Sequence, residues 1–203
     1  MEIRLGALRA KDAKKVIQFA RQGMHFDWYS DSPFVLRLYG RYFWNLEFSR
    51  ATQAIAAYRD GELAGVLLAE VRGEKKTRRT LGRRLYIRLF ELCSGLLFRG
   101  GADVYAQANR EMFARYRETH TPDGEITFFA VDPRLEGQGV GTLLLGELAR
   151  REKGKQFYLY TDSGCTYQFY DRRGFERAGE RGIVMELGGK RVPLRCFLYC
   201  KTL

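Results

Sequence analysis

Apolar residues in the first third of the chain recur with helical and strand-like periods, which predict a strand, two helices and a hairpin. These elements cover, in order, residues 1–5, 11–24, 33–48 and 52–71. Gly23 is a stop signal near the end of the first helix, and Pro33 lies where the second helix begins, a position that suits proline. The hairpin turns at Asp60-Gly61, a dipeptide typical of tight turns.

The middle of the chain begins with its most basic segment and continues as an amphipathic helix. Seven Lys and Arg residues fall within residues 72–84. Apolar side chains then recur with a helical period and predict a helix over residues 85–98. A weaker helical pattern continues over residues 103–118. The helix of residues 85–98 has a wide apolar face that needs a partner surface, which is either the sheet or a second subunit in a homodimer.

The last third of the chain alternates strand and helix patterns. A regular strand over residues 125–131 places Glu125, Thr127, Phe129 and Val131 on one face. A helix, a strand, a short helix and a closing hairpin follow, over residues 141–154, 156–161, 165–174 and 183–200, the last turning at Gly188-Gly189. Together these patterns predict a mixed α/β fold, with helices around one central sheet in a single domain of residues 1–203.

Composition narrows the class of protein. With 203 residues, 45% of them hydrophobic and 29% charged, the chain is typical of a globular domain. No apolar block follows the N-terminus as in a signal peptide, and no run approaches the roughly 18 apolar residues of a membrane span. We therefore expect a cytoplasmic protein with no membrane partner. The formal net charge of +11 favours anionic ligands, which include nucleic acid, acidic membrane surfaces and polyphosphorylated small molecules.

Cysteine and histidine are too sparse to indicate a disulfide framework or a metal site. The cysteines, Cys93, Cys165, Cys196 and Cys200, form no C-x-x-C pair. Cys196 and Cys200 lie four residues apart, on one face of a strand, and we expect their thiols to be buried. With two histidines in the chain, neither a zinc site nor a Ser-His-Asp triad is expected.

Three glycines at alternate positions, Gly137, Gly139 and Gly141, separate the strand of residues 125–131 from the next helix. Their spacing fits neither a Walker A loop, which needs a Lys after its last glycine, nor the dinucleotide fingerprint G-x-G-x-x-G. Glycines let the main chain approach a ligand closely, and the first N–H groups of a helix lack partners within it. Since the helix dipole also favours anions, this junction predicts a binding site for a phosphate or pyrophosphate.

The segment "AVDPRLEGQGVGTLLL" resembles the acyl-CoA-binding signature of the GNAT superfamily of N-acyltransferases. That signature is a strand ending in V-x-P, then [RQ]-x-x-G-x-[GA], then an apolar helix. Val131, Pro133, Gly139 and Gly141 match it. Glu136 departs from it, because the family has Arg or Gln there. A carboxylate beside a pyrophosphate is unfavourable unless it turns away or pairs with Arg134.

A second segment, "DSGCTYQFYDRRGF" at residues 162–175, resembles a later GNAT motif, N-x-x-A-x-x-F-Y-x-[KR]-x-G-F. The matching residues are Phe169, Tyr170, Arg172, Gly174 and Phe175. Ser163 and Thr166 replace the usual Asn and Ala. With both motifs in order, the chain is identified as a GNAT member, which implies a mostly antiparallel central sheet. In that family the strands matching residues 62–71 and 125–131 are joined directly, so residues 72–124 are a helical insertion.

The resemblance implies acetyl-CoA as co-substrate and an amine that attacks its thioester in a ternary complex. The strands of residues 125–131 and 156–161 would splay apart around the thioester, and a backbone N–H near Ala130 or Val131 would stabilise the oxyanion. The pyrophosphate would lie on the N–H groups of residues 138–142. The full implied cofactor-binding set is Phe129, Ala130, Val131, Gln138, Gly139, Val140, Gly141, Thr142 and Ser163.

The family position of Tyr170 implies a general acid that protonates the leaving thiolate, and a phenol of ordinary pKa about 10 suits that step. The alternative is that Tyr170 only packs against the cofactor. The general base is left open among four residues: Glu125, Glu70, His120 and Asp162.

The acceptor pocket implied by the family lies at the loop after the first helix. Phe26, Asp27, Trp28 and Tyr29 there combine aromatic rings with a carboxylate, which can hold a cationic amine. They could equally anchor the loop in the core. The acceptor is a small molecule or a protein.

Two other functions compete with acetyl transfer. The basic segment allows a nucleic-acid- or ribosome-associated binding protein, although it has little aromatic interleaving for base stacking. The departures at Glu136, Ser163 and Thr166 allow a GNAT fold that binds acyl-CoA without turnover.

Overall fold

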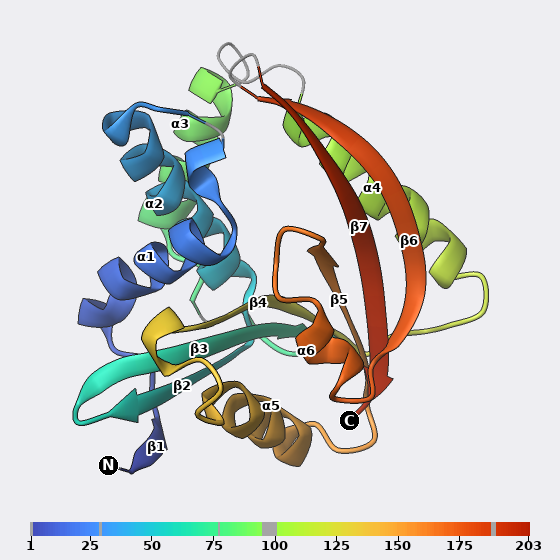
Figure 1. Ribbon diagram of the computed structural model, residues 1–203. Coiled ribbons are helices and arrows are strands. Elements are labelled where there is room, and N and C mark those ends of the chain that lie inside the picture. Colours follow the sequence, from blue (N-terminus) through green and yellow to red (C-terminus); the bar gives the residue numbers. More distant parts are fainter. Residues whose placement is uncertain (1, 29, 77, 95–100, 188–189) are drawn as a thin grey trace.

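The computed structural model describes residues 2–28, 30–76, 78–94, 101–187 and 190–203, and one seven-stranded sheet runs through them (Figure 1). Its strands are β1 (Ile3–Gly6), β2 (Gln53–Arg59), β3 (Glu62–Val71), β4 (Gly124–Val131), β5 (Gln156–Asp162), β6 (Glu176–Leu187) and β7 (Lys190–Thr202). In space they follow the order β1-β2-β3-β4-β5-β7-β6. Every neighbouring pair is antiparallel except β4 and β5. The predicted fold class is confirmed.

The helices of the described residues follow the predicted order. They are α1 (Ala13–Gly23), α2 (Pro33–Arg50), α3 (Leu81–Ser94), α4 (Gly101–Tyr116), α5 (Val140–Arg151) and α6 (Gln168–Asp171). Pro33 opens α2, where the Ser32 hydroxyl accepts a hydrogen bond from the Val35 N–H at 3.5 Å. No helix among these is long and apolar enough to cross a membrane.

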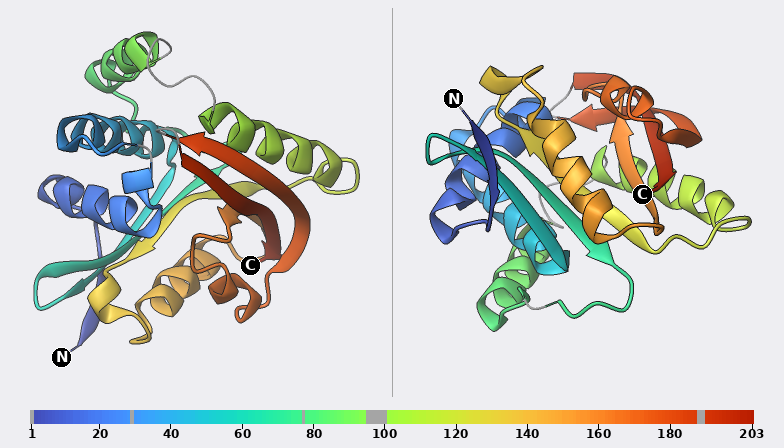
Figure 2. Two further views of the ribbon diagram at one scale, coloured as in Figure 1. Left: turned by 45° about the horizontal axis from the view of Figure 1, so that its top comes forward. Right: turned by 90° about the horizontal axis from the view of Figure 1, so that it is seen from below.

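Helices cover both faces of the sheet (Figures 1 and 2). On one face, α1 and α2 bury Val16, Phe19 and Trp44 against the sheet. On the other face, α5 buries Leu144 and Leu148 in a second core. The second core fixes α5, and with it the glycine loop at its start, against β2 and β3.

The segment of residues 72–124 carries α3 and α4. Ala108, Met112 and Tyr116 of α4 pack on β7, where Cys196 and Cys200 are buried as predicted. By contrast α3 contacts α2. The end of the predicted helix 85–98 and the turn Gly188-Gly189 lie outside the described residues.

A β-bulge interrupts β4 beside the gap between β4 and β5. Phe128 pairs with Leu68 and Ile126 pairs with Ala69, so Thr127 has no partner in the register. An extra residue of this kind shifts the alternation of side chains by one position.

Because of the bulge, the prediction that Glu125, Phe129 and Val131 lie on one face of β4 is wrong. Glu125 faces α2, where it accepts a hydrogen bond from Arg50 Nη2 at 2.7 Å. Beyond the bulge, Phe129 and Val131 pack with the α5 core, whereas Phe128 and Ala130 pack with α1 and α2. Regular alternation placed Glu125, Phe129 and Val131 together because a bulge has no signal in the residue pattern.

Glu47 of α2 is a buried carboxyl within a group of charged residues. Its side chain lies 3.9 Å from the Arg50 guanidinium, which also pairs with Glu70 and Glu125 at 3.3 and 2.7 Å. Glu47 Oε2 is buried without a hydrogen-bond partner in the described part of the chain. Burial raises the pKa of Glu47 to about 7.

This pKa predicts a pH-dependent gain in stability for Glu47→Gln. Because the folded pKa of about 7 lies above the ordinary value of 4.5, the wild type loses stability as pH rises between these values. The neutral amide removes that loss, so we expect the free energy of unfolding at pH 8 to rise by about 2 kcal/mol. At pH 5 the difference is small. Urea unfolding at both pH values measures it, with exposed Glu118→Gln as control, and an equal effect at both pH values contradicts it.

Candidate active site

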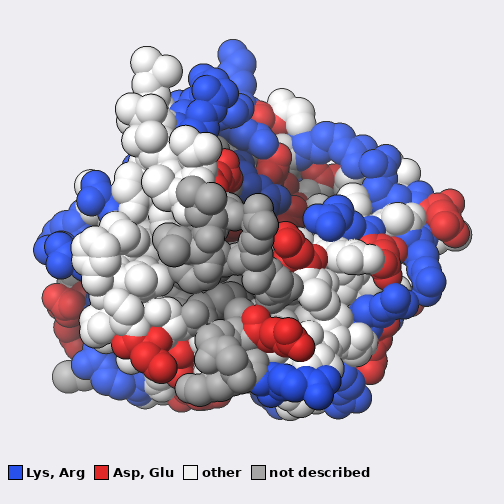
Figure 3. All heavy atoms as spheres, turned by 90° about the horizontal axis from the view of Figure 1, so that it is seen from above, with Lys and Arg blue, Asp and Glu red and all other residues white. Residues whose placement is uncertain are grey.

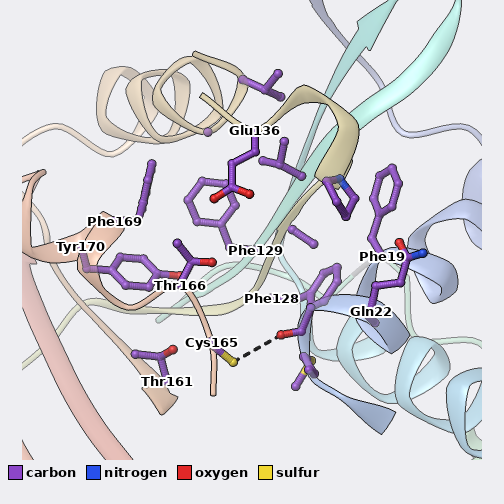
Figure 4. A pocket seen from close by; sticks show the side chains of 18 of the residues that line it. Phe19, Gln22, Phe128, Phe129, Glu136, Thr161, Cys165, Thr166, Phe169 and Tyr170 are labelled. Atoms are coloured by element: carbon purple, nitrogen blue, oxygen red, sulfur yellow. Dashed lines mark hydrogen bonds between the residues drawn. The ribbon is translucent and has the colours of Figure 1, made fainter. Parts of the chain in front are cut away.

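The strands β4 and β5 separate to form a cavity of about 840 Å³ (Figure 4). They pair only at Gly124 with Phe157 and at Glu125 with Tyr158. Beyond these residues the two strands diverge, and residues 126–131 of β4 and 160–162 of β5 line the cavity. The splay that the family resemblance implied is confirmed.

The glycine loop forms one end of this cavity. Gly137 and Gly139 have φ angles of 76° and 83°, a left-handed conformation that favours glycine. Gly139 is the N-cap of α5 and offers no side chain, so the first N–H groups of the helix are left for a ligand. At Gly141 an added Cβ would lie 3.1 Å from the Phe169 ring. The loop is therefore a bare, left-handed turn at a helix N-terminus, as an anion cradle requires.

Most of the predicted cofactor-binding residues line the cavity: Phe129, Ala130, Val131, Gly139, Val140, Gly141 and Thr142. Gln138 and Ser163 are engaged elsewhere. Gln138 Oε1 accepts a hydrogen bond from Arg59 at 2.6 Å. Ser163 is bound to Arg195 of β7 through its N–H at 2.9 Å and its hydroxyl at 3.1 Å.

Glu136 lines the cavity, and its carboxylate points inward above Phe129 (Figure 4). Arg134 does not neutralise it, because Arg134 donates two side-chain hydrogen bonds to Asp132, at 3.0 and 2.7 Å. These bonds also hold the pKa of Asp132 below its usual range. Glu136 thus places a negative charge next to the predicted anion cradle.

Two arginines that follow α6 add positive charge to the same end of the cavity. Arg172 and Arg173 both line it. The Arg173 guanidinium lies 4.9 Å from the centre of the Phe169 ring and donates to the Thr142 hydroxyl. The family motif contains one basic residue, matched by Arg172, but Arg173 has no signal in it. The fold alone shows that Arg173 reaches the glycine loop.

If the predicted cofactor binds at the glycine loop, replacing Glu136 by Gln is expected to strengthen acetyl-CoA binding about three- to tenfold. The change removes a carboxylate that repels phosphates and keeps the shape of the side chain. Calorimetric titration measures the affinity, with exposed Glu118→Gln as the control for a general change of net charge. Unchanged or weaker binding by Glu136→Gln contradicts the prediction that a phosphate group of the ligand binds beside residue 136.

Tyr170 lies in an aromatic cage with its hydroxyl end directed into the cavity beside Thr166 (Figure 4). Its ring contacts those of Phe129, Phe175 and Tyr199, at centroid distances of 6.4, 5.5 and 5.7 Å. Burial raises the pKa of Tyr170 above its ordinary value. The phenol therefore stays protonated at neutral pH, and the raised pKa makes it a weaker acid than an ordinary phenol.

Only one of the four candidate bases lines the cavity in the described structure. Asp162 does so, accepting hydrogen bonds from the Tyr105 hydroxyl at 3.0 Å and the Gly164 N–H at 2.8 Å. Glu125 is bound by Arg50 and by the Tyr158 hydroxyl, and Glu70 by Arg50 and Lys76. His120 stacks on Tyr116 after α4.

The predicted acceptor loop lies next to the cavity. Phe26 is 1% exposed in the core beneath α1 and α2. Asp27 and Trp28 do not line the cavity, and Tyr29 lies outside the described residues. Their role in acceptor binding stays a prediction.

Residues just before that loop do reach the cavity. His25 lines it, and its Nε2 lies 3.0 Å from the Gly164 carbonyl oxygen. The His25 ring also stacks on Trp28 at 4.4 Å. Tyr105 enters the cavity from α4. Sequence reasoning missed Tyr105 because residues 72–124 match no family motif.

Comparisons with known proteins agree with this geometry. The family model described as "Acetyltransferase (GNAT) family" matches residues 18–175. No curated protein matches the chain. Solved structures match over nearly their whole length and share the fold.

Three of these structures illustrate the sequence identity and structural similarity of the matches. A structure of histone acetyltransferase HPA2 and related acetyltransferase from Corynebacterium glutamicum is 16% identical, with a TM-score of 0.59 and coverage of 98% of this chain and 96% of that one. A PaiA N-acetyltransferase from Thermoplasma acidophilum, in complex with coenzyme A, is 14% identical, with a TM-score of 0.54 and full coverage of both chains. Arabidopsis thaliana NAA60, in complex with a bisubstrate analogue, is 13% identical, with a TM-score of 0.53 and coverage of 98% and 97%.

The family match covers both sequence motifs, the splayed strands and the glycine loop at the start of α5. The chain therefore belongs to the GNAT acetyltransferase family.

Proposed function

We propose that the protein is an N-acetyltransferase that transfers the acetyl group of acetyl-CoA to a primary amine by direct attack. The observation that carries this proposal is the single cavity that joins an anion cradle, Tyr170 and Asp162. Bound acetyl-CoA supplies an electrophilic thioester carbonyl and a thiolate leaving group. A nucleic-acid-binding function explains neither the glycine loop nor the splayed strands.

The glycine loop and the two arginines after α6 would hold the cofactor. The N–H groups at the start of α5 would bind the pyrophosphate, and Arg172 and Arg173 would balance its charge. Glu136 opposes this binding, so the affinity depends on the backbone donors and the two arginines.

Backbone donors of β4 face the gap between the strands. The Asp132 N–H donates to the Ala64 carbonyl oxygen of β3 at 2.8 Å. Because N–H groups alternate sides along a strand, the Val131 N–H points away from β3 and toward β5. It is therefore the donor that would stabilise charge on the thioester oxygen.

Proton transfers balance the reaction. The amine nitrogen forms a bond to the acetyl carbon while the carbon–sulfur bond breaks. Asp162 would accept the amine proton directly or through water, and Tyr170 would donate its proton to the thiolate. Each group needs to be within hydrogen-bond reach of its partner when both substrates are bound.

Release of free thiol from acetyl-CoA tests the proposal. The acceptor panel contains polyamines, lysine-containing peptides and peptides with free N-termini, because neighbours of this fold have different acceptors and the fold does not select one. Acetylated product confirmed by mass spectrometry supports acetyl transfer. Tight acetyl-CoA binding without thiol release across the panel would favour a non-catalytic binding protein.

Asp162→Asn is expected to lower kcat about 100-fold while acetyl-CoA affinity stays unchanged. The amide keeps the shape of the side chain but cannot accept the amine proton. Ser163→Ala is the matched control, since Ser163 is the next residue and does not line the cavity. If Asp162→Asn keeps the wild-type kcat and pH profile, the base is a different group.

A further inference from the structure

The outward side of α3 carries a stripe of exposed leucines. Leu81, Leu85, Leu89 and Leu92 are 81%, 61%, 53% and 73% exposed. They are spaced four, four and three residues apart, so they share one side of the helix. Single exposed leucines are ordinary, but a contiguous stripe of this kind marks an interaction surface.

The other side of α3 is already packed on α2. The Phe90 ring stacks on Tyr42 with centroids 4.3 Å apart, and the Tyr86 hydroxyl donates to the Leu38 carbonyl oxygen at 3.3 Å. The left view of Figure 2 shows α3 as the outermost helix, stacked on α2. Because these contacts orient the helix, the leucine stripe faces away from the protein.

A basic cavity of about 240 Å³ adjoins the stripe, between α2, the segment before α3 and α3 itself. Its charged lining residues are five cations and one carboxylate: Arg50, Lys76, Arg79, Arg84, Arg88 and Glu91. Arg84 and Arg88 each precede a leucine of the stripe, so they lie along its flank. Seen from above in Figure 3, uncharged atoms form a ridge at the upper left, where α3 lies, and a group of Lys and Arg atoms stands beside it.

Three of the four arginines that line this cavity have spare binding capacity, whereas Arg50 is paired with Glu70 and Glu125. Arg79, Arg84 and Arg88 form no ion pair with the described residues, whereas Lys76 pairs with Glu70. The buried Ser49 hydroxyl in the cavity wall has no hydrogen-bond partner in the described part of the chain. Guanidinium groups match the oxygens of a phosphate, and a hydroxyl can add a further donor.

We propose that α3 and its basic cavity dock the protein on an anionic lipid surface. The leucines would enter the boundary between headgroups and acyl chains, while Arg79, Arg84 and Arg88 hold lipid phosphates. The expectation of no membrane partner rested on the absence of a spanning segment, which an interfacial helix does not need.

Other occupants explain less of this surface. A nucleic acid would use the arginines but leave the leucines in water. A second copy would cover the leucines but bring together two chains of net charge +11 at their arginine-rich flanks. An anionic membrane matches both the apolar stripe and the charge beside it.

Co-sedimentation of the full chain with vesicles tests this proposal. Vesicles of phosphatidylcholine with about one third phosphatidylserine should bind the protein at low salt, and vesicles of phosphatidylcholine alone should not. Leu85→Gln/Leu89→Gln should weaken binding at least about tenfold. Arg79→Gln/Arg84→Gln/Arg88→Gln should weaken it about 100-fold.

The matched control removes the same charge elsewhere. Arg110→Gln/Arg115→Gln/Lys153→Gln takes three cations from exposed positions on α4 and after α5 and should bind nearly as the wild type does. Thermal unfolding and acetyl-CoA binding confirm that every variant is folded. Equal losses in this control and in the α3 arginine variant overturn the proposal, because they show a general charge effect.

Two further measurements test whether a second copy of the chain or a nucleic acid, instead of a lipid surface, binds to α3 and its basic cavity. A wild-type dimer that the leucine variant dissociates, without vesicle binding, overturns the proposal in favour of a second copy. Binding of single-stranded RNA that the arginine variant loses and the leucine variant keeps, again without vesicle binding, overturns it in favour of nucleic acid.

Discussion

Gly139→Arg is expected to weaken acetyl-CoA binding at least about 100-fold, equivalent to about 2.7 kcal/mol. Gly139 is the N-cap of α5, and an added Cβ there meets no atom within 4 Å. An arginine therefore fits without a clash in the core. Its side chain would occupy the cradle above the first N–H groups of α5 and its charge would pair with Glu136, so the pyrophosphate is excluded. Calorimetric titration measures the loss.

Gly154→Arg is the control for backbone strain. Gly154 has a φ of 81°, close to the 83° of Gly139, and an added Cβ also meets nothing within 4 Å. Both variants should lose about 1–2 kcal/mol of stability, because a non-glycine residue is strained in a left-handed conformation. Gly154 follows the far end of α5, so only Gly139→Arg should lose the ligand. Equal binding by both variants would mean that the cofactor does not lie on this loop.

Tyr170→Phe is expected to lower kcat by a factor of about 100 to 1,000, with little change in acetyl-CoA affinity. Phenylalanine keeps the ring contacts with Phe129, Phe175 and Tyr199 but has no proton to donate. Since burial raises the pKa of Tyr170, the wild-type phenol stays protonated through neutral pH. Steady-state kinetics with the acceptor found in the amine screen measures the change.

Tyr167→Phe is the matched control for the loss of a hydroxyl. Tyr167 precedes α6 and packs on Phe197 at 4.8 Å, but it does not line the cavity. This variant should keep the wild-type kcat. If Tyr170→Phe also keeps it, Tyr170 only packs against the cofactor, and a different group or water protonates the thiolate.

The mechanism combines features that differ in how well sequence predicts them. The glycine loop is local, since its left-handed turn and the start of α5 need only neighbouring residues, and spacing alone identified it. The association of Arg173 with Thr142 and the inward direction of Glu136 depend on how α6 and the loop lie across the cavity. These contacts decide the charge at the cradle.

The β-bulge in β4 shows the limit of pattern reasoning. Residues 125–131 have a regular alternation, yet Thr127 is left out of the register and reverses it. The bulge lies where β4 begins to part from β5, so pairing between distant strands fixes it. Alternation therefore predicted the strand and misplaced Phe129 and Val131.

The sequence by itself determined the α/β class, most of the elements, the two GNAT motifs and the glycine turn at the start of α5, because periodicity and turn residues act over short distances. Tertiary structure alone decided that Asp162 is the candidate base in the cavity, that Tyr105 enters from α4, and that α3 turns its leucines outward. Each of these depends on packing between segments that are far apart in the chain. The same sequence pattern in residues 85–92 is compatible with a buried or an exposed helix face, and the contacts with α2 select the exposed one.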